Sequence, residues 1–232
     1  MGRHESPEET EVKIRGIILM SIGGILILTS LGLILNHLYE ENIANREAEI
    51  ICSKLIVQIE KEKDSNSTGT SEQLVSDEKA AGIPDESQMI RSKLTDANID
   101  TIDIDGLDYI GYVSIPDLDL DLPVVSKWSY DALKVSPARY SDDGSSYGLV
   151  IAAHNFARHF GKIYSLPEGA VVYFTDVHGV VYSFEVAKQE VLNPEDITKM
   201  TTEPYDLTLF TCTPGGVSRV TVRCTYAGSR AE

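Results

Sequence analysis

The chain begins with one long apolar segment that carries no charge. The twenty residues from Gly16 to Leu35 contain no Asp, Glu, Lys or Arg. At about 1.5 Å of rise per helical residue, this segment matches the roughly 30 Å hydrocarbon core of a bilayer. It is longer than the apolar region of a signal peptide, and no small-residue cleavage site follows it. The pattern therefore predicts an uncleaved transmembrane signal anchor over residues 16–38.

Charges on either side of the anchor indicate its orientation. Lys13 and Arg15 precede the apolar segment, whereas Glu40 and Glu41 follow it. Because basic residues favour the cytoplasmic side, residues 1–15 are expected to form a cytoplasmic tip. We expect a single-pass protein of the cell membrane whose remaining residues lie outside the cytoplasm.

Two segments separate the anchor from the rest of the chain. Residues 39–64 repeat apolar side chains at helical spacing among charged ones, which predicts a juxtamembrane amphipathic helix. The apolar positions are Ile43, Ile50, Ile51, Leu55, Ile56 and Ile59. They could pack on the domain that follows, on a second copy of the chain or on the membrane surface, and the sequence does not choose among these. Residues 65–106 are rich in Ser, Thr, Asp, Glu and Gly, so we expect a flexible acidic spacer with a short helix near Ser87 to Leu94.

From Leu107 onward, short runs of Val, Ile, Tyr and Phe alternate with Gly, Pro, Asp and Ser, which predicts strands. The seven candidate strands are Tyr109–Ile115, Leu118–Val125, Gly148–Ala153, Ala170–Thr175, Val180–Val191, Leu207–Cys212 and Val217–Thr225. Short helices are expected near Ser129–Leu133 and Phe156–Tyr164. Seven strands in 126 residues predict a mainly β domain over residues 107–232, folded as a closed or nearly closed barrel.

The charge balance excludes one class of partner. The chain has 20 Lys and Arg against 36 Asp and Glu, a net charge of −16. Residues 1–106 contribute 10 − 20 = −10 and the remainder 10 − 16 = −6. Because phosphate contacts need clustered Lys and Arg, we expect no binding of nucleic acid.

The cysteines introduce candidate chemistry. An odd number of them, three, leaves at least one free thiol in an extracytoplasmic chain. Cys212 ends a predicted strand, and a tight turn leads to Arg219 at the start of the next one. A guanidinium beside a thiol can stabilise a thiolate or a developing oxyanion. His154 also follows a predicted strand. If the three strand ends converge, they hold a nucleophile, an oxyanion stabiliser and a proton carrier.

These residues carry a resemblance to a known family. The run TLFTC from Thr208 to Cys212, with Arg219 downstream, resembles the TLxTC…R signature of sortases, the membrane-anchored cysteine transpeptidases of Gram-positive bacteria. Ala153-His154-Asn155 is similar to the histidine motif of that family. The resemblance covers roughly Tyr109 to Thr225. It implies an eight-stranded sortase barrel, one strand more than the pattern predicts. It also implies catalytic His154, Cys212 and Arg219, supporting Thr211 and Asn155, and no cofactor or metal.

The resemblance further implies a reaction. Cys212 would attack the Thr–Gly bond of an LPxTG-like sorting signal at the C-terminus of a secreted protein and form a thioacyl enzyme. An amine from a peptidoglycan precursor or a pilin would then resolve that intermediate. His154 would protonate the leaving amine and deprotonate the incoming one, while Arg219 would hold the substrate carbonyl. The helix before the barrel favours a class B-like or class D-like member. The sequence specifies neither the sorting motif nor the acceptor.

The remaining cysteines have structural interpretations. Cys224 alternates with Val220 and Val222, which predicts a buried core thiol. A disulfide between Cys212 and Cys224 would inactivate such an enzyme. No role is assigned to Cys52. With Cys212 merely structural, the chain would instead be an anchored extracytoplasmic β-domain that binds a ligand or partner without catalysis.

Several His and Asp residues are of types that can bind metals. His154 and His159 lie five residues apart without a further ligand at suitable spacing, so His159 is not expected to bind a metal. His178 lies in a predicted turn and is expected to face solvent. Asp117, Asp119 and Asp121 could offer carboxylates to Ca²⁺, but their period-two alternation favours the solvated face of one strand.

Overall fold

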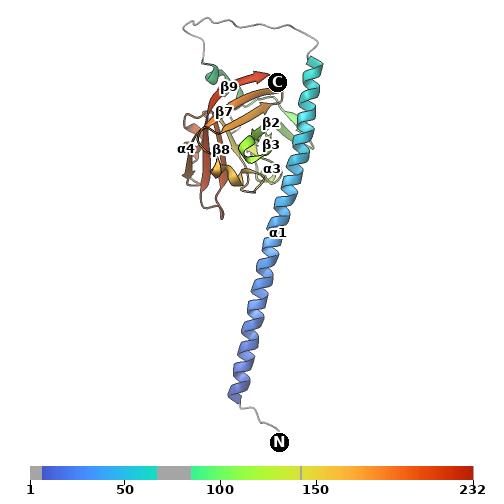
Figure 1. The fold of residues 1–232 in the computed structure, drawn as a ribbon, viewed down its shortest axis with the longest axis vertical. Coiled ribbons are helices and arrows are strands. Elements are labelled where there is room, and N and C mark those ends of the chain that lie inside the picture. The colour runs from blue at the N-terminus through green and yellow to red at the C-terminus, as the bar shows by residue number, and fades with distance from the viewer. Residues whose placement is uncertain (1–6, 67–84, 142, 232) are drawn as a thin grey trace. The chain divides into compact units, whose positions relative to one another are not determined.

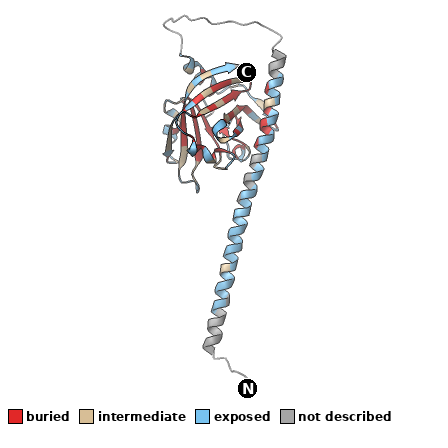
Figure 2. Ribbon diagram, in the orientation of Figure 1, coloured by how far each residue is buried: buried red, intermediate tan, exposed pale blue. Residues whose placement is uncertain are grey.

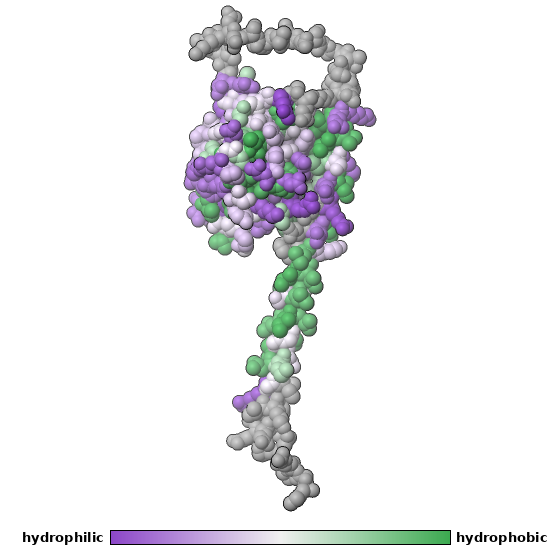
Figure 3. Space-filling view, in the orientation of Figure 1, coloured by the Kyte–Doolittle hydropathy of each residue, from purple (hydrophilic) through white to green (hydrophobic). Residues whose placement is uncertain are grey.

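We describe a computed structural model of the chain, which covers residues 7–66, 85–141 and 143–231. The chain divides into two compact units, residues 1–43 and residues 44–232. Helix α1 (Pro7–Asn66) has residues in both units, and its part in the first unit contains the segment Ile18–Asn36, which is long and apolar enough to cross a membrane, with a mean hydropathy of 2.4. Figure 3 shows this segment as a mainly apolar surface with some paler, less hydrophobic side chains. The expected cytoplasmic tip lies partly outside the described residues.

The second unit is mainly β. Its strands are β1 (Ile102–Ile104), β2 (Leu107–Ile115), β3 (Leu120–Val125), β4 (Ala138–Arg139), β5 (Leu149–Ala152), β6 (Val171–Asp176), β7 (Val180–Leu192), β8 (Leu207–Cys212) and β9 (Arg219–Ala231). Its short helices are α2 (Glu86–Thr95), η1 (Pro116–Leu118), α3 (Tyr130–Val135), η2 (Phe160–Ser165) and α4 (Ile197–Thr202). All seven predicted strands are present; β8 has its predicted bounds, and each of the others has at least one shifted end.

The strands close into a ring (Figure 1). The order is β2-β3-β4-β5-β8-β9-β7-β6, and β6 pairs back with β2 to complete eight strands. The short β1 extends the ring beside the start of β2. The closed eight-stranded barrel is therefore confirmed. The pattern missed two strands, β4 and β1, because two or three residues are too short to show an alternation. β1 lies in the segment expected to be a flexible spacer.

Two predicted strands begin two residues later than expected, and the short helix expected near Phe156–Tyr164 begins at Phe160 as η2. The strand predicted from Leu118 begins at Leu120, because η1 and a left-handed Asp119 at φ 53° precede it. The strand predicted from Val217 begins at Arg219, because a turn with two left-handed glycines occupies the preceding residues. Both corrections reflect local turn geometry that hydrophobic alternation does not report.

The apolar stripe of α1 packs on the barrel. Within the second unit, α1 buries Ala48, Ile51, Cys52, Leu55 and Ile59, and these residues contact the barrel core (Figure 2). Of the positions expected in the stripe, Ile50 is 56% exposed and points away. Of the three surfaces that the sequence left open, the apolar stripe therefore packs on the domain that follows it.

Part of the expected spacer is folded. Helix α2 covers the short helix expected near residues 87–94, and it buries Ile90 and Leu94 in the barrel core. Arg91 pairs with Asp206 at 2.6 Å and Lys93 with Asp176 at 2.8 Å. These contacts fix the segment before β1, whereas residues 67–84 lie outside the described residues. The spacing of Ile90 and Leu94 was the local signal that this helix docks on the barrel, but the polar composition of the segment obscured it.

The barrel separates two apolar layers. Alternate residues such as Leu207, Leu209, Val222 and Cys224 point into the ring and form its interior. Residues of the opposite parity, including Val150, Ala152 and Phe210, pack outside the ring with α1, α3 and α4. Cys212 has the parity of Phe210, so it belongs to the outer face.

Candidate active site

His154 and Cys212 follow equivalent positions on two neighbouring strands. β5 and β8 pair in parallel, with Ala152 opposite Phe210. His154 follows this pair by two residues on its chain segment, just as Cys212 follows it by two residues on β8. The last hydrogen bond of the ladder joins the Ala153 amide to the Phe210 carbonyl at 3.1 Å, just before His154. Since neighbouring strands lie about 4.8 Å apart, the two side chains leave the backbone as direct neighbours.

Arg219 lies on the other side of Cys212. β8 and β9 are antiparallel, and Cys212 pairs directly with Arg219. Cys212 on β8 and Arg219 on β9 are therefore paired on the outer face of the barrel, and His154 follows the end of β5, the other neighbour of β8. We call these three residues the row. The structure brings together the strand ends that sequence reasoning expected to converge.

Two glycines and local hydrogen bonds fix the conformation of the turn before Arg219. Gly215 and Gly216 adopt φ of 82° and 74°, which side chains with a Cβ rarely adopt. Ser218 donates its amide to the Thr213 hydroxyl at 3.0 Å and accepts from the Thr213 amide at 2.9 Å. Arg219 Nη1 donates to the carbonyls of Gly216 at 3.0 Å and Ser218 at 3.1 Å. Among the described residues, its Nε and Nη2 have no hydrogen-bond partner, so they remain available to a ligand.

His154 sits on a compact loop. Its ring stacks on Phe156 with centroids 4.8 Å apart, and its carbonyl accepts from the Phe160 amide at 3.1 Å. A Cβ at Gly161 would lie 2.5 Å from the Asn155 carbonyl, so only glycine allows this close approach. Burial lowers the pKa of His154, which keeps the imidazole neutral near pH 7. No hydrogen bond links the ring to Cys212 in the described part of the chain.

Thr211 and Asn155 lie directly beside these two residues. Thr211 is buried, and its hydroxyl donates to the Ala153 carbonyl at 2.9 Å. It therefore joins the strand of Cys212 to the strand of His154. Asn155 is half-buried, and its backbone carbonyl packs against Gly161.

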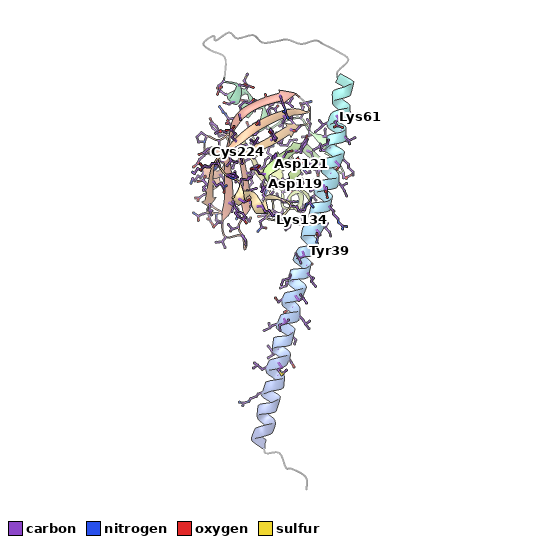
Figure 4. The ribbon with its side chains drawn as sticks, in the orientation of Figure 1. Tyr39, Lys61, Asp119, Asp121, Lys134 and Cys224 are labelled. Carbon is purple, nitrogen blue, oxygen red and sulfur yellow. The ribbon has the colours of Figure 1, made fainter. Side chains whose placement is uncertain are left out.

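The three cysteines differ in exposure, and all three are free. Cys212 is partly exposed, whereas burial raises the pKa of both Cys52 and Cys224 to about 12. Cys224 pairs with Leu207, five positions from Cys212 along β8 (Figure 4). At about 3.4 Å per residue this separation is roughly 17 Å, too far for a disulfide. The buried core thiol predicted at Cys224 is confirmed.

The other candidate ligands do not assemble into a metal site. The residues that the structure describes contain no group of three or more metal-binding side chains. His159 is buried, while exposed His178 lies 2.9 Å from Asp100. Asp117, Asp119 and Asp121 are solvated as predicted, but only Asp121 lies on a strand; Figure 4 labels Asp119 and Asp121.

Sequence reasoning missed Arg223 and Glu190. Arg223 is completely buried on the outer face of β9, and its Nε donates to Glu190 at 3.0 Å. An Arg within a run of Val and Thr was the available signal, because a charge in a buried strand needs a partner.

Comparison with known proteins extends the observations. A family model described as the sortase domain matches residues 113–227, which include the whole row. Similar solved structures include sortase A of Corynebacterium diphtheriae, a lid mutant (25% identity, 51% of this chain and 70% of that chain, TM-score 0.46). Sortase C1 of Streptococcus suis is another, with 26% identity over 52% of this chain and 73% of that chain and a TM-score of 0.47. Sortase C of Streptococcus pneumoniae has 23% identity over 63% of this chain and 90% of that chain, with a TM-score of 0.47. No curated protein matches the chain. On the match of its domain, this chain belongs to the sortase family of cysteine transpeptidases.

Proposed function

We propose that the chain is a membrane-anchored sortase that uses Cys212, His154 and Arg219 to transfer a secreted protein from its sorting signal to an amine. The observation that carries this proposal is the row of these three residues at the adjacent ends of β5, β8 and β9. A structural cysteine needs neither a histidine on one neighbouring strand nor an arginine on the other. The row therefore favours catalysis over an anchored domain that only binds.

Acylation uses all three side chains. His154 is neutral near pH 7 and takes the proton of the Cys212 thiol. The thiolate attacks the carbonyl carbon of the Thr–Gly bond in an LPxTG-like signal, and the carbonyl oxygen becomes an oxyanion. Arg219 donates to that oxygen through the guanidinium atoms that its own turn leaves available. When the intermediate collapses, the C–N bond breaks and imidazolium gives its proton to the leaving amine.

Deacylation repeats these steps in reverse. An amine attacks the thioacyl carbon, His154 accepts the amine's proton, and the C–S bond breaks to release thiolate. An amide replaces the thioester, so no oxidant or cofactor is needed. The acceptor amine belongs to a peptidoglycan precursor or a pilin, and the folded segment before the barrel favours a class B-like or class D-like enzyme.

The proposed function includes a location outside the cytoplasm. We assign residues 16–38 to a single-pass signal anchor with a cytoplasmic N-terminus, because an apolar helix follows Lys13 and Arg15. Residues 107–232 form the catalytic barrel, and the structure adds α1 from Ala44 and α2 to its folded unit. Secreted proteins with a C-terminal sorting signal would reach this barrel after translocation.

Trapping the acyl enzyme tests the proposal. The full chain in detergent is mixed with a library of LPxTG-like peptides, and intact mass spectrometry follows. We expect one peptide mass, less its leaving group, on Cys212 and none on the Cys212→Ala variant. The matched Cys224→Ala variant should still acylate. An adduct that persists in Cys212→Ala, or no acylation by any peptide, would contradict the proposal.

A further inference from the structure

Arg223 lies on the same face of β9 as Arg219 but is buried, whereas Arg219 is partly exposed. Both side chains lie on the outer face of β9, four residues apart, and Arg223 is 0% exposed. A buried guanidinium destabilises the fold unless its donors and charge are satisfied. Its partners therefore indicate what the fold gains from it.

These partners come from three other elements. Arg223 donates to Glu190 on β7 at 3.0 Å and to the Thr208 hydroxyl on β8 at 3.1 Å. It also donates to the carbonyls of Met200 at 2.7 Å and Lys199 at 2.8 Å on α4. A helix of six residues has few hydrogen bonds of its own, and a cation near its final carbonyls stabilises it. Arg223 therefore fastens α4 to the strand that ends in Cys212.

We call Arg223, Glu190 and their contacts with α4 the clamp. Glu190 stays charged at all physiological pH values. Burial alone would raise the pKa of Glu190, but hydrogen bonds from Lys199, Lys188 and Arg223 lower it to about 2. Lys199 itself lies on α4, at 2.9 Å from the carboxylate. The carboxylate thus holds α4 both directly and through Arg223.

The clamped helix borders the catalytic row. On β7, Leu192 pairs with Arg219, and both Leu192 and Met200 of α4 pack in the outer apolar layer with Phe210, two residues before Cys212. Ile197 of α4 is 51% exposed, so this short helix presents an apolar side chain to solvent. A substrate lying along the row would border α4, because Leu192 beside Arg219 packs in one layer with Met200 of that helix.

We propose that Arg223 is a positioning residue that holds α4 and the β7–β8 connection as a preformed wall for the sorting peptide. This inference rests on the proposed sortase function of the row. Arg223 itself touches neither substrate nor the reacting thiol. Without the contacts of Arg223, α4 must become ordered when the peptide binds, and this ordering costs binding free energy. Removing Arg223 should therefore raise KM and leave kcat nearly unchanged.

The test compares Arg223→Lys and the milder Glu190→Gln with the unaltered full chain in detergent. Peptide turnover gives KM and kcat, iodoacetamide labelling reports Cys212 reactivity, and hydrogen exchange reports opening of α4. We expect KM to rise about tenfold in Arg223→Lys, kcat to stay within about twofold, and exchange of the α4 amides to accelerate about tenfold. Labelling of Cys212 should not change.

Lys93→Met is the matched control, because it breaks the Lys93–Asp176 pair without touching α4. It should leave KM unchanged. A fall in kcat at constant KM in Arg223→Lys, or unchanged exchange of α4, would overturn the inference. If Arg223→Lys does not fold, Glu190→Gln decides by the same criteria. If the unaltered enzyme acylates no peptide, the proposed function fails, whereas the exchange of α4 still reports on the clamp.

Discussion

Thr211 donates its hydroxyl to the Ala153 carbonyl at 2.9 Å and so joins the residue before Cys212 to the residue before His154. This hydrogen bond lies where β5 has ended and β8 is ending, beyond the last paired residues of the parallel ladder. It therefore fixes the spacing of the two candidate catalytic side chains at the point where regular pairing stops.

Replacing Thr211 with Val should test this link, because Val keeps the shape and removes the hydroxyl. The buried Ala153 carbonyl loses a donor, which should lower the free energy of unfolding by about 1–2 kcal/mol. We expect turnover of a sorting peptide to fall about tenfold as the two side chains lose their fixed spacing. Thr225→Val, at an exposed position on β9, is the control and should change neither quantity. Unchanged turnover in Thr211→Val would remove the residue from the site.

The exposure of the thiols predicts selective alkylation. Burial raises the pKa of Cys52 and Cys224 to about 12, so at pH 8 roughly one molecule in ten thousand carries a thiolate there. We expect iodoacetamide to label Cys212 alone in the folded chain and all three cysteines in urea. Peptide mass mapping distinguishes the sites, and native labelling of Cys224 at the rate of Cys212 would contradict the buried assignment.

The barrel and its site differ in how far the sequence predicts them. Alternation located β8 to the residue, and the motif around Cys212 identified the family, because both signals are local. The clamp around Arg223 was missed, because its partners Glu190, Thr208 and Met200 come from separate elements. Nothing local marks which carbonyls a buried arginine will meet.

The helix near residues 87–94 was predicted, but the docking of residues 85–106 on the barrel was missed for a related reason. The segment is mostly polar, and only Ile90 and Leu94 of α2 reach the core. Two apolar positions are too few to distinguish a docked helix from a solvated one by composition. The ion pairs that fix it, such as Arg91 with Asp206, join residues far apart in the sequence.

Arg219 should lose its function when it becomes Lys. The guanidinium uses Nη1 to bind the carbonyls of Gly216 and Ser218, and its other donors remain available. A lysine cannot anchor to the turn and also present directed donors to a substrate oxygen. We expect acylation to slow about 100-fold, measured by peptide turnover. Arg230→Lys, an exposed position on the same strand, should stay within about twofold; equal losses in both variants would argue against an oxyanion role.

His154 should also make stability depend on pH. Burial lowers its pKa in the folded chain below the ordinary value near 6.5, so between these two pKa values the unfolded chain binds more protons. The free energy of unfolding therefore falls as pH decreases from about 7 toward the lowered pKa. His154→Gln should lose this part of the pH dependence in urea titrations at pH 7.5 and 5.5. A steeper dependence in the variant would show that the sign is wrong.

The packing of α1 predicts that the barrel needs a helix far from it in sequence. Leu55 is 0% exposed within the core shared with β1 and β2, whereas Val57 on the same helix is 62% exposed. Leu55→Ala should lower the free energy of unfolding by about 2–5 kcal/mol, because it removes buried atoms and leaves a cavity. Val57→Ala should change it by less than about 0.5 kcal/mol. By the same reasoning, a fragment from Ala44 should fold, while one from Leu107 lacks both α1 and α2 and should melt at a lower temperature. Calorimetry of the two fragments decides this, and equal melting temperatures would show that the helix is only a tether.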